Sequence, residues 1–117
     1  MRIQPLFAVL AILALAGCAA DPAPTEQFRL TEQALEQAKA VGATDAVPEL
    51  KLAEEKFARA RSDMASQSFK HARMRAEQAE LDARLAEARV LTQKSEEQLS
   101  ALDARVNRLR KQLGEVQ

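Results

Sequence analysis

The segment from Phe69 to Leu113 contains neither glycine nor proline, the two residues that most often end a helix. Its 45 residues predict a helix about 67 Å long, at 1.5 Å per residue. The 117-residue chain has no Trp or Tyr and four Phe, and alanine dominates its hydrophobic residues. Such a chain cannot fill a deep globular core, but its small residues let neighbouring helices approach closely. The sequence therefore predicts an all-α fold, a helical hairpin or three-helix arrangement with a long C-terminal coiled-coil helix.

A first, shorter helix is predicted from Glu26 to about Val41. Thr25 is placed as its N-cap, and Gly42 follows its last turn, where a C-terminal glycine cap belongs. The apolar positions of this helix are Phe28, Leu35 and Ala38, with Leu30, Ala34 and Val41 widening the stripe.

A second helix is predicted to begin at Pro48, because proline is tolerated in the first turn of a helix. The stretch over 64–69 predicts a break before the long helix, with Ser66 or Ser68 as the next cap. One continuous helix over 48–113 stays open as the alternative, since no helix breaker follows Pro48 in that range. The apolar positions of the second helix recur at steps of three and four: Leu50, Ala53, Phe57, Ala60 and Met64.

The long helix changes character at Val90. Before that point it carries two apolar rows, and two rows can pack on both shorter helices. The first row is Met74, Leu81, Leu85 and Ala88, and the second is Ala72, Ala76, Ala79, Ala83, Ala86 and Val90. After that point a single seam with heptad spacing remains, as in a coiled coil: Leu99, Leu102, Val106, Leu109, Leu113 and Val116.

This seam needs a partner, because the shorter helices are only about 24 and 27 Å long and cannot cover the whole long helix. The partner is another envelope protein, a second copy, or this chain after folding back. A fold-back has local support, since Ser95-Glu96-Glu97-Gln98 has the form of a capping box that starts a helix. The sequence thus divides into an Ala-rich helical hairpin or bundle over 26–90 and a coiled-coil arm over 91–117.

Flanking charges bear on self-pairing of the seam. With Leu99 at heptad position a, a parallel homodimer opposes Arg84 with Arg89, and likewise opposes Arg105 with Arg110. These like charges disfavour parallel pairing and leave antiparallel or heterologous pairing open.

The N-terminal residues have the form of an export signal. An apolar run of ten residues, Leu6 to Leu15, is too short to span a bilayer core of about 30 Å. It leads into Leu15, Ala16 and Gly17, followed by Cys18, the sole cysteine. This stretch resembles the lipobox of bacterial lipoprotein signal peptides. The resemblance implies a signal peptide over 1–17, lipid such as palmitate on Cys18, and a Pro-containing lipidated tether over 18–25.

The charged residues indicate no catalytic or metal site. Acidic and basic side chains balance at 17 each, so no pull toward nucleic acid is expected. The one histidine, His71, has no Glu-x-x-His partner, and Glu80 with Arg84 is an ordinary helical i, i+4 pair. The sequence predicts no enzyme, no cofactor and no metal. A basic cluster near the helix end is best explained by the helix dipole, with a non-covalent peptidoglycan contact left open: Arg105, Arg108, Arg110 and Lys111.

The pattern over 28–90 resembles the family known as domain of unknown function 4398. The resemblance rests on spaced alanines, the Gly42-Ala43 turn and Pro48-Glu49-Leu50 followed by Ala53. It implies a short Ala-rich helical lipoprotein of proteobacteria and carries over no functional residues.

Together these features predict a non-enzymatic, lipid-anchored element of the cell envelope, with a structural or protein-interaction role in the periplasm. Ala19 rather than Asp follows Cys18, which in enterobacteria-like sorting implies the periplasmic face of the outer membrane. The alternative is a peptide- or chaperone-type binding module that uses the groove between the two shorter helices.

Overall fold

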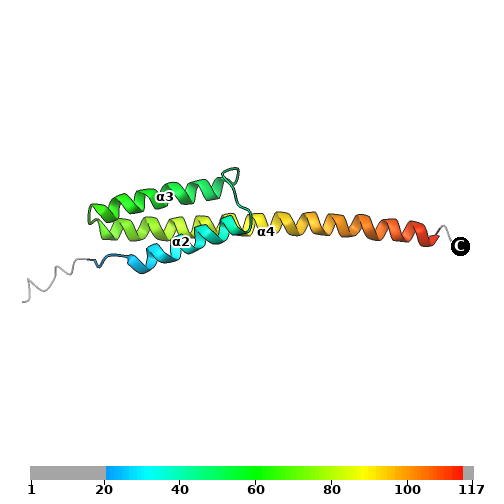
Figure 1. Cartoon of the computed structure of the whole chain (residues 1–117), viewed down its shortest axis with the longest axis horizontal. Coiled ribbons are helices and arrows are strands. Elements are labelled where there is room, and N and C mark those ends of the chain that lie inside the picture. The colour runs from blue at the N-terminus through cyan, green and yellow to red at the C-terminus, as the bar shows by residue number, and fades with distance from the viewer. Residues whose placement is uncertain (1–20, 115–117) are drawn as a thin grey trace, which may run out of the picture.

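The structure, a computed structural model, describes residues 21–114. Three helices follow one another: α2 (Thr25–Ala40), α3 (Pro48–Ala65) and α4 (Phe69–Gly114). Both shorter helices pack along the first half of α4, and α4 then continues far beyond them as a single rod (Figure 1). This arrangement confirms the predicted all-α fold with a long C-terminal helix. The segment of α4 beyond the hairpin, residues 91–114, is called the arm below.

The start of α2 differs by one residue from the prediction. Thr25 is the first helical residue, Pro24 occupies the N-cap position, and no side chain caps the helix. The Phe28 N–H instead donates to the Pro24 carbonyl at 3.0 Å. The prediction of Thr25 as N-cap is therefore wrong, because the main-chain carbonyl of the preceding proline accepts the first helical bond.

The turn after α2 confirms the role of Gly42. This residue has a φ of +104°, and the next N–H, of Ala43, donates to the Ala38 carbonyl at 2.9 Å. This pattern is a Schellman cap, which favours glycine at the left-handed position. Lys94 of α4 adds a second cap, because its Nζ donates to the Val41 carbonyl at 2.6 Å. A positive charge there complements the negative end of the α2 dipole.

The predicted break between α3 and α4 is confirmed at residues 66–68. The Ser68 N–H donates to the Asp63 carbonyl at 2.9 Å, so α3 also ends in a Schellman cap. Its left-handed position holds Gln67, with a φ of +60°. Ser66 does not start α4, since its hydroxyl donates back to the Asp63 carbonyl.

Replacing Gln67 by glycine is expected to stabilise the protein by about 1 kcal/mol, because glycine adopts the left-handed conformation without the steric cost of a Cβ. Urea unfolding followed by circular dichroism measures this change. Gln67→Ala is the matched control, with an expected free energy of unfolding no higher than that of the natural chain. Equal stabilisation by both substitutions would show that the side chain, not the backbone, is responsible.

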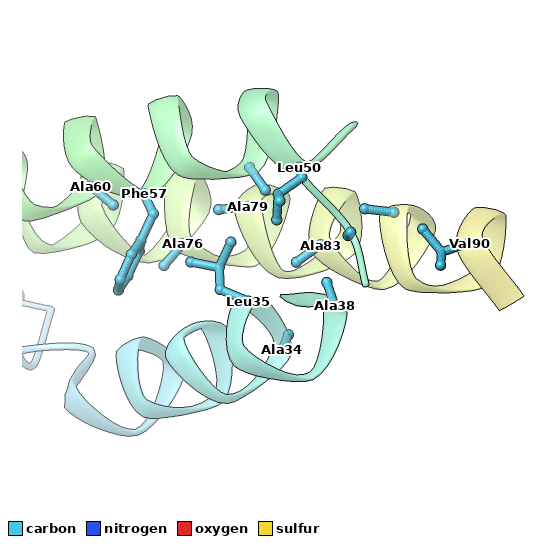
Figure 2. Close-up of a cluster of buried hydrophobic side chains, with 13 residues drawn as sticks. Ala34, Leu35, Ala38, Leu50, Phe57, Ala60, Ala76, Ala79, Ala83 and Val90 are labelled. Carbon is cyan, nitrogen blue, oxygen red and sulfur yellow. The ribbon is translucent and has the colours of Figure 1, made fainter. Parts of the chain in front are cut away.

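The core is built around one row of alanines on α4. This row lies between α2 and α3 and is fully buried except for Val90, which is 9% exposed: Ala72, Ala76, Ala79, Ala83, Ala86 and Val90. Alanine side chains let the helix backbones approach so closely that the Thr31 hydroxyl of α2 donates to the Ala76 carbonyl of α4 at 3.0 Å. Figure 2 shows the larger residues, Leu35 and Phe57, pointing toward each other from α2 and α3 beside this row.

The other apolar row of α4 is not part of the core. Met74, Leu81 and Leu85 are 47%, 66% and 54% exposed. The prediction that both rows pack on the shorter helices is therefore wrong. One row of alanines suffices for both neighbours, because a ridge of small side chains fits into the groove between two helices.

Helix α4 does not fold back. It is continuous over 46 residues, and the Ser95 hydroxyl donates to the Leu91 carbonyl four residues earlier, at 2.9 Å. That bond lies inside a helix, so Ser95 is not an N-cap. The fold-back alternative is wrong, and so is the alternative of one continuous helix over 48–113.

Ion pairs with alternating sign join α3 to α4 at seven-residue intervals. Asp63 Oδ2 lies 2.6 Å from Arg75 Nε. The next pair joins Lys56 Nζ to Asp82 Oδ2, also at 2.6 Å. Glu49 accepts a hydrogen bond from Arg89, which holds the pKa of the Glu49 carboxyl below its ordinary value. These three ion pairs are called the charge ladder below. Sliding α4 by one heptad would place Lys56 opposite Arg89, so the charge ladder fixes the register of α3 against α4.

Reversing one rung of this ladder with Lys56→Asp is expected to destabilise the protein by about 1–2 kcal/mol, because two poorly solvated carboxylates then face each other. The double variant Lys56→Asp with Asp82→Lys is expected to recover most of that loss. Urea unfolding of the four proteins in the cycle measures the coupling. Reversal of the exposed Arg29 is the control, with an expected cost of about 0.5 kcal/mol or less. If the effects of the two single substitutions on the free energy of unfolding simply added, the two residues would not be coupled, which would contradict the charge ladder.

Candidate functional site

The arm is the most exposed part of the described chain. Every residue from 91 to 114 is exposed. The predicted partner-binding residues, called the arm seam, all lie here with large exposed fractions: Leu99 62%, Leu102 55%, Val106 43%, Leu109 51% and Leu113 71%. Monomeric proteins rarely expose a contiguous apolar stripe of this length, and such a stripe marks an interaction site. Val116 lies outside the described residues.

The exposed stripe extends beyond the arm into the hairpin half of α4. Leu81, Leu85 and Ala88 are exposed and continue the arm seam at the same alternating steps of three and four. Together these residues form one heptad pattern, called the full seam below, whose a and d positions are Leu81, Leu85, Ala88, Thr92, Ser95, Leu99, Leu102, Val106, Leu109 and Leu113. The buried alanine row occupies the b and f positions, on nearly the opposite side of the helix.

Sequence reasoning missed this continuity because it assigned Leu81 and Leu85 to packing inside the hairpin. The signal was nevertheless present. The seven-residue register continues from Leu81 to Leu113, and only Thr92 and Ser95 among its a and d positions are polar. In a straight helix such a repeat drifts by about 20° per heptad, whereas in a left-handed supercoil it keeps facing a partner helix.

Charged residues flank the full seam on its e side. They are Asp82, Arg89, Glu96, Asp103 and Arg110. Asp82 and Arg89 already pair with α3 in the charge ladder, and the other three lie on the exposed arm. On the opposite flank, the Gln27 amide and then Arg84 lower the pKa of the Glu80 carboxyl by donating hydrogen bonds to it. The seam is therefore bordered by fixed charges of both signs.

The groove between α2 and α3 is crossed by side chains from both helices. The rings of Phe28 and Phe57 lie 5.2 Å apart between their centroids. Arg61 covers the Phe57 ring at 4.4 Å and also pairs with Glu32 of α2 at 3.0 Å. Farther along, Lys39 Nζ lies 2.6 Å from Glu54 Oε1. These side chains bridge the groove and leave an open hollow beside Phe57 and Arg61. Nothing in the described chain covers the full seam.

The predicted lipobox, Leu15, Ala16, Gly17 and Cys18, lies outside the described residues. Within residues 21–114, no helix is long and apolar enough to cross a membrane. The same range contains no cluster of three or more His, Cys, Asp or Glu residues arranged to hold a metal ion. His71 is exposed on α4.

A model of the family described as Domain of unknown function (DUF4398) matches residues 26–102. Among solved structures, the crystal structure of a DUF4398 family protein from Pseudomonas aeruginosa PAO1 is 69% identical to this chain, with a TM-score of 0.80. That match covers 82% of this chain and 100% of the other. The search of the curated proteins found no significant match. The family match includes both short helices and the first part of the arm.

Proposed function

Since this chain belongs to the DUF4398 family, a domain of unknown function, we propose its role from its surface: a non-enzymatic protein that presents α4 to a protein partner. One observation carries the proposal: the arm seam is exposed along a continuous helix, and nothing else in the described chain covers it. Burying a leucine side chain contributes about 1.5–3 kcal/mol, so a coiled-coil partner would gain substantially from covering this seam.

The proposal includes a lipid anchor at Cys18, on the periplasmic face of the outer membrane. It is supported by the lipobox pattern and by the position of Asp21 at the end of α4 opposite the arm. Asp21 lies beside the start of α4, with its carboxylate 3.9 Å from Arg73. The tip of the arm lies about 68 Å away along α4, at the other end of the molecule (Figure 1). A tether at residues 18–25 would therefore hold one end of the protein at the membrane and leave the arm free to reach a partner.

The interaction part of the proposal is tested by deleting residues 95–117. The last buried residue of α4 is Val90, so the thermal unfolding of the hairpin should change little, while capture of the partner from envelopes is lost. Partner capture is measured with a photo-crosslinker in the hairpin half of α4, at Leu85. A truncated protein that still crosslinks the same ligand from Leu85 would show that the ligand binds outside the arm, and would contradict the arm as the binding surface.

The anchor part is tested separately with Cys18→Ala. The natural chain should incorporate labelled palmitate and sediment with membranes, whereas the variant should do neither. Cys18→Ser serves as a second variant, because its hydroxyl keeps the size of the thiol. Labelled, membrane-bound Cys18→Ala protein would overturn the anchor without affecting the interaction proposal.

A further inference from the structure

The full seam is long enough and suitably charged for one particular partner. Resting on the proposed function, we infer that α4 pairs with α4 of a second copy of this chain, in antiparallel orientation. Leu81 then lies opposite Leu113 of the second copy, Leu85 opposite its Leu109, and Ala88 opposite its Val106. The paired segment spans residues 81–113, about 50 Å of helix. The arm of each copy thereby covers the exposed leucines on the hairpin half of the other.

Charge selects this register. In an antiparallel pair the e positions of one helix face the e positions of the other. Asp82 then faces Arg110 of the second copy, and Arg89 faces its Asp103. Each contact occurs twice by symmetry, because a two-fold interface repeats every pair. One like-charged contact remains, between the two Glu96 side chains at the centre.

The same two contacts extend the charge ladder of the hairpin. Asp82 already lies against Lys56 of α3, so Arg110 of the second copy would place this carboxylate between two cations. Arg89 already donates to Glu49 of α3, so the second copy's Asp103 would place this guanidinium between two carboxylates. The result is a continuous set of alternating charges from α3 through α4 to the second α4.

The other registers bring like charges together. A shift by one heptad in one direction opposes Asp82 with Asp103 and Arg84 with Arg105. A shift in the other direction opposes Arg89 with Arg110 and Glu96 with Asp103. Parallel pairing opposes Arg84 with Arg89 and also Arg105 with Arg110. Opposed like charges destabilise a coiled coil and exclude alternative pairings.

Two charge reversals test the inference by sedimentation equilibrium. The protein used is the chain from residue 18 onward with Cys18→Ser, which includes every described residue. This chain should form a dimer at micromolar concentrations. Asp103→Lys and Arg110→Glu should each weaken the dimer about tenfold, because both create two like-charged contacts. Arg108→Glu makes the same change of charge away from the seam and should leave the dimer constant unchanged.

The two charge reversals distinguish the registers by whether they weaken or strengthen the dimer. In either shifted antiparallel register, both Asp103→Lys and Arg110→Glu would strengthen the dimer. In the parallel dimer, Arg110→Glu would strengthen it and Asp103→Lys would leave it unchanged. Any of these results would overturn the inferred register. If the chain stays monomeric, a second copy is not the partner. Failure of the proposed function is a separate result, because the arm seam would then give no crosslink in envelopes.

Discussion

Replacing Ala79 by leucine is expected to destabilise the hairpin by about 3 kcal/mol or more. Ala79 is fully buried between α2 and α3, in the middle of the alanine row. Three added carbon atoms find no space there, so the helices must separate, and overpacking of this kind typically costs 1–3 kcal/mol and occasionally more. Separation would also lengthen the bond between the Thr31 hydroxyl and the Ala76 carbonyl one turn away.

Urea unfolding followed by circular dichroism measures this effect. The control is Ala101→Leu, at an exposed position of the arm outside the seam, where leucine is expected to change stability by less than about 0.5 kcal/mol. If Ala79→Leu were tolerated as well as the control, close packing through alanines could not be what holds the three helices together.

The double variant Leu102→Asp with Leu109→Asp is expected to abolish association through the arm seam while the hairpin stays folded. Both leucines are more than half exposed and lie on the arm, where no residue is buried, so the free energy of unfolding should change little. Burial of two leucines contributes about 3–6 kcal/mol per chain, which corresponds to a loss of at least about hundredfold in affinity.

Sedimentation velocity measures association, and thermal unfolding of the same samples measures the fold. The matched control is Ser100→Asp with Asn107→Asp, which introduces two aspartates with the same spacing and the same change of net charge, one position away from the seam. The control should associate like the natural chain. If both double variants lost association, the cause would be the added negative charge or unfolding of the arm, and not the loss of the seam leucines.

Much of this fold could be predicted from the sequence because its signals are local. Proline at the first helical turn and glycine after the last one placed the ends of two helices. The long segment without breakers predicted α4, and the apolar spacing of α3 identified its buried face: Leu50, Ala53, Phe57 and Ala60. These features depend on backbone conformation and on the 3.6-residue period of the helix, and residue type and spacing indicate both directly.

The assignment of the α4 faces could not be predicted in the same way. Leucine is more hydrophobic than alanine, so a row with Leu81 and Leu85 looks like core. The structure buries the alanines instead, because close contact between three backbones requires small side chains. The spacing of a row of apolar residues shows that they share one face of the helix, but it does not show which other helix packs against that face.

Two further features depend on tertiary context. The charge ladder was visible as charges seven residues apart, at Glu49, Lys56 and Asp63, but pairing them requires the antiparallel register of α3 and α4. The capping box at Ser95 failed as a signal because a serine inside a helix can donate to the carbonyl four residues earlier. A local motif cannot distinguish these two uses.

The central claim is that the arm seam is a binding surface in the intact protein. The most direct measurement places a photo-crosslinker at Leu102 in cells that make the full chain, and compares it with one at Arg108. We expect a crosslinked adduct from position 102, with the mass of two chains for a second copy, and little or no adduct from position 108. Equal adducts from both positions, or none from position 102, would contradict the claim.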